Sequence, residues 1–192
     1  MTIELLHSPY PDGYGEALLP LDQCKAHLAV MADDQDDLII VLRDAAIEVV
    51  EQYCSVRLLE TEGLVLRADA FPIRTGALIL GARPVKEIAA VKWTARGGAE
   101  VDGGVASFRL ATHGDLLPAF GSSWPSDVAG DLEITFTAGY PAGAVPKALL
   151  HAVKMFMAHL WAHREAVIDS GSAGEVPFGV TMLCGPYRRV LI

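Results

Sequence analysis

Residues 138–166, AGYPAGAVPKALLHAVKMFMAHLWAHREA, contain a long helical pattern around which the rest of this sequence is organised. Pro146 suits the first position of a helix, where a missing N–H leaves no hydrogen bond unmade, so we predict a helix over 146–166. Apolar side chains lie on nearly all faces of this helix rather than in one stripe. We therefore expect its own domain to cover one face and a neighbouring subunit to cover another.

Five large side chains are the predicted contacts between subunits. Four of them lie on this helix. The fifth belongs to a Trp-Pro pair outside the helix, and its pattern fits either a core aromatic or an interface anchor. The five residues are Met155, Phe156, Leu160, Trp161 and Trp124.

Two further helices are predicted before residue 55. The first covers 21–30, with Asp22 as its N-cap, and the second covers 38–54, where apolar residues recur at helical spacing. An acidic turn, 32–37, lies between them and supplies a cap, but it lacks the spacing of a calcium loop. Residues 1–20 are rich in Pro and Gly, so we expect an irregular N-terminal arm.

Residues 56–137 change to short runs of period two separated by Gly and Pro, which predicts a small antiparallel β part inserted between the helices. The chain is therefore expected to be an α+β protein, with a helical bundle in a domain over 21–166 and an extended C-terminal tail over 167–192. The candidate strands are 57–67, 77–80, 88–94, 107–111 and 131–137.

Composition restricts the possible functions. The 192 residues carry a formal net charge of −9, and 52% of them are hydrophobic, which excludes a disordered chain. An acidic protein does not bind exposed duplex DNA tightly, but the same charge sign suits a channel through which DNA slides. We also expect three reduced thiols, no signal peptide and no membrane span.

Motifs of catalysis, metal binding and cofactor binding are missing from the sequence, so we expect no catalytic residue, metal or cofactor. His159 and His163 share a helix face and could form half of a metal site, but no third ligand lies nearby in sequence. No GxSxG, GxGxxG or phosphate-binding loop is present. A small zinc or manganese enzyme using these histidines remains an alternative, which elemental analysis would test.

A series of short phrases resembles the head–tail connector, or adaptor, proteins of long-tailed bacteriophages and gene transfer agents. The resemblance covers roughly residues 20–189 and rests on the order of the phrases rather than on any one of them. They are LDQCKAHL (21–28), the acidic turn, AAIEVVEQY (45–53), RPV (83–85), WP (124–125), TAGY (137–140), VP (145–146), RE (164–165), Leu183 and PYR (186–188).

The resemblance implies a structural role in the neck of a virion or phage-like particle assembled in the bacterial cytoplasm. Such adaptors form a ring, commonly of about twelve copies, beneath the portal of the DNA-filled head, and they bind stopper and tail proteins. Double-stranded DNA passes through the ring without sequence-specific binding. By the same resemblance the portal contacts are Leu183, Pro186, Tyr187, Arg188, Arg189, Val190, Leu191 and Ile192. A stopper or tail-completion role in the same machine is the alternative.

Overall fold

A computed structural model describes residues 3–6, 10–72, 76–163 and 177–188. The chain divides into two compact units. The β unit contains Met1–Tyr10 and Leu59–Tyr140, and the helical unit contains Pro11–Leu58 and Pro141–Ile192. Among the helices described, none is both long and apolar enough to cross a membrane.

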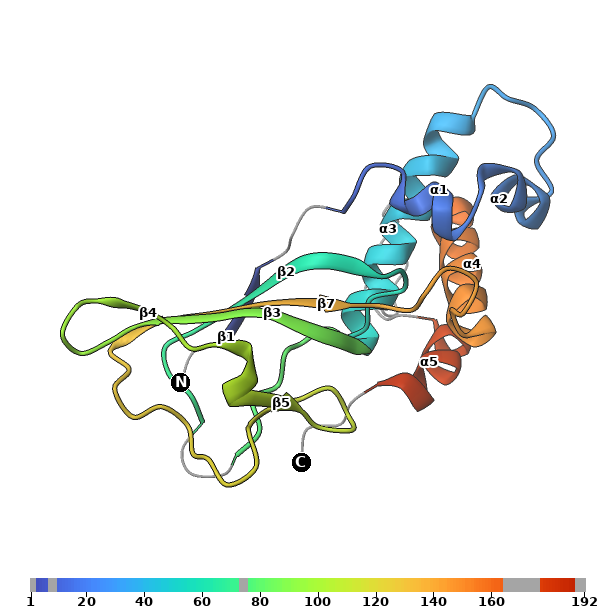
Figure 1. The fold of residues 1–192 in the computed structure, drawn as a ribbon. Helices are drawn as coiled ribbons and strands as arrows, with labels where there is room; N and C mark the ends of the chain where they lie inside the picture. The colour runs from blue at the N-terminus through green and yellow to red at the C-terminus, as the bar shows by residue number, and fades with distance from the viewer. Residues whose placement is uncertain (1–2, 7–9, 73–75, 164–176, 189–192) are drawn as a thin grey trace, which may run out of the picture. The chain divides into compact units, whose positions relative to one another are not determined.

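The β unit is built on an antiparallel sheet with the strand order β1-β2-β7-β3-β4 (Figure 1). A separate two-stranded hairpin, β5-β6, follows the 3₁₀ turn η1 (Val105–Ser107). The strands are β1 (Ile3–Leu6), β2 (Thr61–Ala68), β3 (Val85–Thr94), β4 (Glu100–Asp102), β5 (Phe108–Leu110), β6 (Leu116–Pro118) and β7 (Gly130–Ala138).

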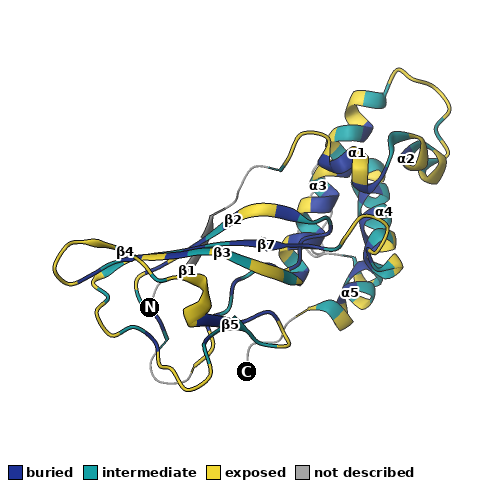
Figure 2. Cartoon of the chain, viewed as in Figure 1, coloured by how far each residue is buried: buried dark blue, intermediate teal, exposed yellow. Residues whose placement is uncertain are grey.

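Alternation along the central strands explains why one face of this sheet is buried. Leu132, Ile134 and Phe136 of β7 are fully buried, whereas Glu133 between them is half-buried and pairs with Arg67 of β2. An aromatic cluster covers that face, with Phe71 stacked on Trp124 at 4.7 Å between ring centroids. Figure 2 shows the C-terminal end of β7 buried and the β3–β4 turn exposed.

The helical unit contains α1 (Tyr14–Leu18), α2 (Leu21–Leu28), α3 (Asp36–Cys54), α4 (Lys147–Ala162) and α5 (Phe178–Cys184), followed by the 3₁₀ turn η2 (Gly185–Tyr187). In Figure 1, α4 runs beside α3 and α5 lies below α4; α4 packs against both. Its core combines α3 side chains with those of α4. They include Ile39, Ala46, Val50, Leu149, Val153 and Met157, all of them buried.

The α+β class predicted from sequence is confirmed, but four features differ. The β part is a substantial sheet rather than a small one. The arm predicted as irregular contains β1, which pairs with β2, and α1. Gln35 and Pro20, not the predicted aspartates, occupy the N-cap positions of α3 and α2, so Asp36, Asp37 and Asp22 lie in the first turns. Residues 77–80 form only an isolated bridge, Leu78 to Leu116.

Candidate assembly surfaces

Helix α4 is the element on which the predicted subunit contacts depend. Pro146 occupies the N-cap position, one residue before the helix begins. The proline suits this position because a backbone N–H here would have no partner within the helix. Leu149, Ala152, Val153 and Met157 recur at helical spacing and are buried inside the helical unit. This face needs no second subunit.

The predicted contacts on α4, Met155, Phe156, Leu160 and Trp161, are all half-buried. Part of the apolar surface of α4 is covered by the chain itself. Gly179 of α5 lies so close to Met155 that a Cβ at position 179 would meet its Cε at 2.6 Å. Helix α5 therefore takes up some of the apolar surface that the sequence assigned to a neighbour.

The fifth predicted contact, Trp124, lies in the β unit. It is buried, and its indole Nε1 donates a hydrogen bond to the carbonyl oxygen of Gly76 at 3.0 Å. These features fit the first of the two interpretations of Trp124 made from sequence, a core aromatic. An interface role for Trp124 stays a prediction.

The segment predicted as an extended tail is helical where the structure describes it. Val180 and Cys184 of α5 are buried, while Phe178 and Met182 project outward and are exposed. This period of about four residues is that of an amphipathic helix. The helix was not predicted from sequence because it is short.

The predicted portal contacts begin inside α5, at Leu183, and continue beyond its end. Leu183 and Tyr187 are half-buried and Pro186 is exposed. The Arg188 guanidinium lies over the Tyr53 ring, 4.8 Å from its centroid. The remaining predicted contacts, Arg189, Val190, Leu191 and Ile192, lie outside the described residues.

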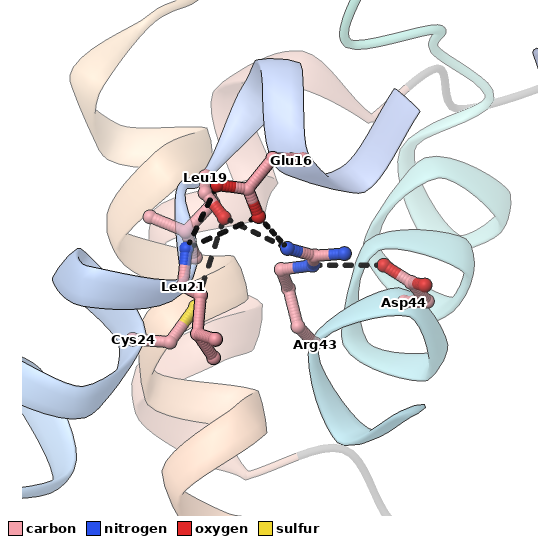
Figure 3. A network of polar contacts seen from close by, with 6 residues as sticks. All are labelled: Glu16, Leu19, Leu21, Cys24, Arg43 and Asp44. Atoms are coloured by element: carbon pink, nitrogen blue, oxygen red, sulfur yellow. Dashed lines mark hydrogen bonds and ion pairs between the residues drawn. The ribbon is translucent and has the colours of Figure 1, made fainter. Parts of the chain in front are cut away.

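A buried arginine fastens α1 to α3, and Figure 3 shows its contacts. Arg43 Nη1 lies 2.7 Å from Glu16 Oε2, and its Nε lies 2.9 Å from Asp44 Oδ1. Gly15 permits this approach, since a Cβ there would stand 2.0 Å from Asp44 Oδ1. The ion pairs with Asp44 and Glu16 outweigh burial and raise the Arg43 pKa above its ordinary value.

Glu51 is the second buried charge of α3. Its Oε2 accepts from Arg57 Nη1 at 2.9 Å, and its Oε1 accepts from the backbone N–H of Leu58 at 2.6 Å and from the Tyr14 hydroxyl. This carboxylate therefore joins α1, the end of α3 and the segment that follows it. Neither Arg43 nor Glu51 was singled out by the sequence analysis.

The acidic turn between α2 and α3 binds a lysine of the same chain. Lys25 Nζ lies 2.5 Å from Asp33 Oδ1 and 2.7 Å from Asp36 Oδ1. These hydrogen bonds raise the pKa of Lys25, and the bond from Lys25 lowers the pKa of Asp33. The lysine contacts agree with a solvated turn that neutralises part of its own charge.

The histidines of α4 do lie together, as their spacing predicted. The rings of His159 and His163 are 4.5 Å apart, and His163 Nδ1 is 3.0 Å from the carbonyl oxygen of His159. Within the described parts of the chain, no group of three His, Cys, Asp or Glu side chains could hold a metal ion. Among these described residues, the pair has no third ligand of the kind that a zinc site needs.

All three cysteines, Cys24, Cys54 and Cys184, are free and buried. Burial raises the pKa of the Cys24 thiol to about 11, and a hydrogen bond with Cys54 lowers the pKa of Cys184. The Cys54 Sγ also lies 3.9 Å from the carbonyl oxygen of Cys184, so this contact joins α3 to α5.

We predict that these thiols react with iodoacetamide on the order of a hundredfold more slowly in the native protein than in the unfolded chain, because alkylation requires local opening. Mass spectrometry after a timed pulse at mildly alkaline pH measures the reaction. A Ser122→Cys variant, with its new thiol at an exposed position, is the control and should be labelled rapidly. Rapid native labelling at Cys184 would show that α5 does not stay packed on α3.

No protein-family profile matches the chain, and no curated protein matches it. Solved structures do match, over 100% of this chain and 97% of the matched chain in each case. One belongs to the virion of a native gene transfer agent particle, with 26% identity and a TM-score of 0.74.

Two more matches come from particle necks. One is the neck of an empty gene transfer agent particle computed with C6 symmetry, at 27% identity and a TM-score of 0.73. The other is the neck of a native particle computed with C12 symmetry, at 25% identity and a TM-score of 0.72. The chain has the fold of a gene transfer agent neck protein.

This neck fold includes both units, because the match extends over the whole chain. It agrees with the resemblance noted in the sequence, which named gene transfer agents beside long-tailed phages. The matched chains are components of a structural assembly, in line with the absence of catalytic motifs from the sequence.

Proposed function

We propose that this chain is a non-enzymatic structural component of the neck of a gene transfer agent or related phage-like particle. The observation that carries the proposal is the full-length similarity to chains of two gene transfer agent necks. Identity of 25–27% over both units supports a shared role more strongly than a common fold in one unit would.

Within the neck, we propose the role of an adaptor that forms a ring beneath the portal and extends the DNA channel. The C12 symmetry of one matched neck supports twelve copies in a closed ring. The net charge of −9 suits a channel that DNA crosses without adhering, because exposed carboxylates repel phosphates. Stopper and tail proteins would then bind the opposite side of the ring.

The proposed portal-binding element is the end of the chain from Leu183, including Pro186, Tyr187, Arg188 and the residues 189–192. The exposed apolar residues Phe178 and Met182 of α5 lie directly before it and would extend the apolar contact area. Arg188 could exchange its contact with Tyr53 for a carboxylate of the portal, since an arginine pairs well with a planar anion.

A stopper or tail-completion protein is the second candidate, because the matches name the neck and not one ring within it. Light scattering of the purified chain, alone and mixed with the portal protein of the same particle, separates the two. An adaptor is expected to form a stoichiometric ring on the portal. A stopper would bind an assembled neck or a tail protein and leave the portal alone.

The matched control is a variant that lacks residues 186–192 but keeps α5. It should fold normally and lose portal association, because it keeps α5 with Leu183 but lacks the rest of the proposed contact segment. If the shortened chain binds the portal as well as the full chain, the assigned contacts are wrong. If the full chain binds neither portal nor any neck protein, the proposed function itself is contradicted.

A further inference from the structure

A pocket in the β unit is not explained by the fold. It has a volume of about 330 Å³ and lies beside the β5–β6 hairpin and the loop that follows β6. Arg109, Leu117, Phe120, Ser122 and Ser123 are among the residues that line it. The pocket thus combines an apolar wall with one cation and two hydroxyl groups.

Arg109 is poorly satisfied by its own chain. Its Nε is buried and has no hydrogen-bond acceptor among the described residues, and within the same residues the side chain forms no ion pair. The guanidinium instead stacks over the Phe120 ring, 4.2 Å from the centroid. A buried N–H without an acceptor is unfavourable, so an incoming oxygen anion would be stabilised here.

Phe120 gives the same region an exposed apolar side chain that a partner could bury. Its side chain is 86% exposed although it is a large aromatic. Val105, also exposed, belongs to a neighbouring segment. This segment lies beside the loop after β6 because the backbone N–H of Ala119 donates to the carbonyl oxygen of Ser107, two residues after Val105. Arginine and aromatic side chains around a small pocket are typical of interface hot spots. We call Val105, Arg109, Phe120 and Ser122 the arginine pocket surface.

A protein carboxylate fits this surface better than a DNA phosphate. Affinity for duplex DNA needs several lysines and arginines that together neutralise several phosphates. Arg109 is a single cation, in a chain with 24 acidic and 15 basic side chains. One carboxylate with an apolar neighbour would satisfy both the guanidinium and Phe120.

The helical unit presents such a group at the turn between α2 and α3. Met31 is 97% exposed there, and Leu38 and Val41 are further exposed apolar side chains on the first turns of α3. Asp34 and Asp37 lie among them, exposed and without an ion pair among the described residues. We call these five residues the acidic-apolar surface.

We propose that the acidic-apolar surface of one copy binds the arginine pocket surface of a second copy of this chain. The two surfaces differ, so the contact is heterologous, and repeated around an axis it can close a ring. Asp34 or Asp37 pairs with Arg109, and Met31 packs on Phe120, whose ring suits a thioether. This inference rests on the proposed ring and names the residues that hold neighbouring copies together.

Disulfide trapping tests the contact even if it is weak. Full-length Asp34→Cys and Ser122→Cys proteins are mixed with oxidised glutathione, and covalent heterodimers are counted by mass spectrometry. We expect roughly tenfold more heterodimer than from Asp34→Cys mixed with Arg96→Cys, which places the second thiol in the exposed β3–β4 turn. The native cysteines are buried and should not compete.

A charge swap checks the chemistry of the trapped contact. Adding Arg109→Glu to the Ser122→Cys protein should lower the yield by roughly tenfold, and adding Asp37→Lys to the Asp34→Cys partner should restore much of it. Yields that do not change in either variant would overturn the proposed pairing with Arg109.

Failure of this contact can be told apart from failure of the proposed function. If rings form on the portal but the Asp34→Cys and Ser122→Cys proteins do not cross-link, only the proposed contact between copies is overturned. No ring and no portal association overturn both proposals. Retention of duplex DNA at low salt that Arg109→Glu abolishes, again without the cross-link, would assign the pocket to phosphate and overturn the contact between copies.

Discussion

Replacing Glu51 by alanine is expected to lower the free energy of unfolding of the helical unit by about 3 to 5 kcal/mol, the range for breaking a buried ion pair. The substitution removes the carboxylate of the ion pair with Arg57, which is itself buried. It also removes the acceptor for the backbone N–H of Leu58 and for the Tyr14 hydroxyl. Glu48→Ala on the exposed side of the same helix should cost less than about 0.5 kcal/mol.

Urea denaturation followed by far-UV circular dichroism measures these differences, since all the described α-helices belong to the helical unit. A second variant makes the mechanism testable. Replacing both partners, in Glu51→Ala with Arg57→Met, should recover part of the lost stability because the buried charge of Arg57 is removed together with its carboxylate. If the double variant is less stable than Glu51→Ala alone, the buried charge is not the source of the loss.

Glu51 and Arg43 also show where sequence reasoning about α3 stops. The apolar spacing of this helix predicted its length, and the helix begins two residues before the predicted start. Its packing face was not predicted, because Leu38 and Val41 of the expected apolar stripe are exposed, whereas the buried face runs from Ile39 to Cys54. Both charged residues lie on that buried face, although a solvated side is the ordinary expectation for a charge. They are buried because α1 covers them, and α1 lies in a stretch whose prolines and glycines gave no helical signal.

In the β unit, too, local sequence patterns predicted some strands and missed those that depend on distant pairing. Alternation in sequence located β2, β3, β5 and β7 to within a few residues. Strands β4 and β6, of three residues each, were missed, whereas β5 of the same length falls within the longer predicted segment 107–111. Strand β1 depends on pairing with β2 far along the chain, and no local pattern encodes that partner.

The candidate surfaces were predictable only where they depend on a long helix. The breadth of the apolar pattern on α4 indicated burial on several sides, and α3 and α5 both pack against it. The sequence did not reveal that α5 forms one of these sides, because its seven residues were read as part of an extended tail. The pocket at Arg109 had no motif, since its residues meet only through the β5–β6 hairpin and the following loop.

Replacing Phe156 by aspartate is expected to reduce ring assembly on the order of a hundredfold, the scale of losing an aromatic hot spot. The Phe156 side chain is only half-buried by its own unit, and its ring stacks on that of His159 with 6.1 Å between the centroids. A charge there would have to be desolvated in the proposed contact with a neighbour, which adds to the lost apolar area. The yield of rings on the portal, counted by negative-stain electron microscopy, is the measurement.

The matched control for this helix is His151→Asp, which makes the same change in formal charge at an exposed position of α4. It should assemble like the natural chain. Circular dichroism separates assembly from folding, and Phe156→Ala serves if the aspartate variant unfolds, since it removes the ring without burying a charge. If folded Phe156→Asp and Phe156→Ala both form normal rings, α4 contributes no subunit contact at this position, and its remaining apolar surface is covered within one chain.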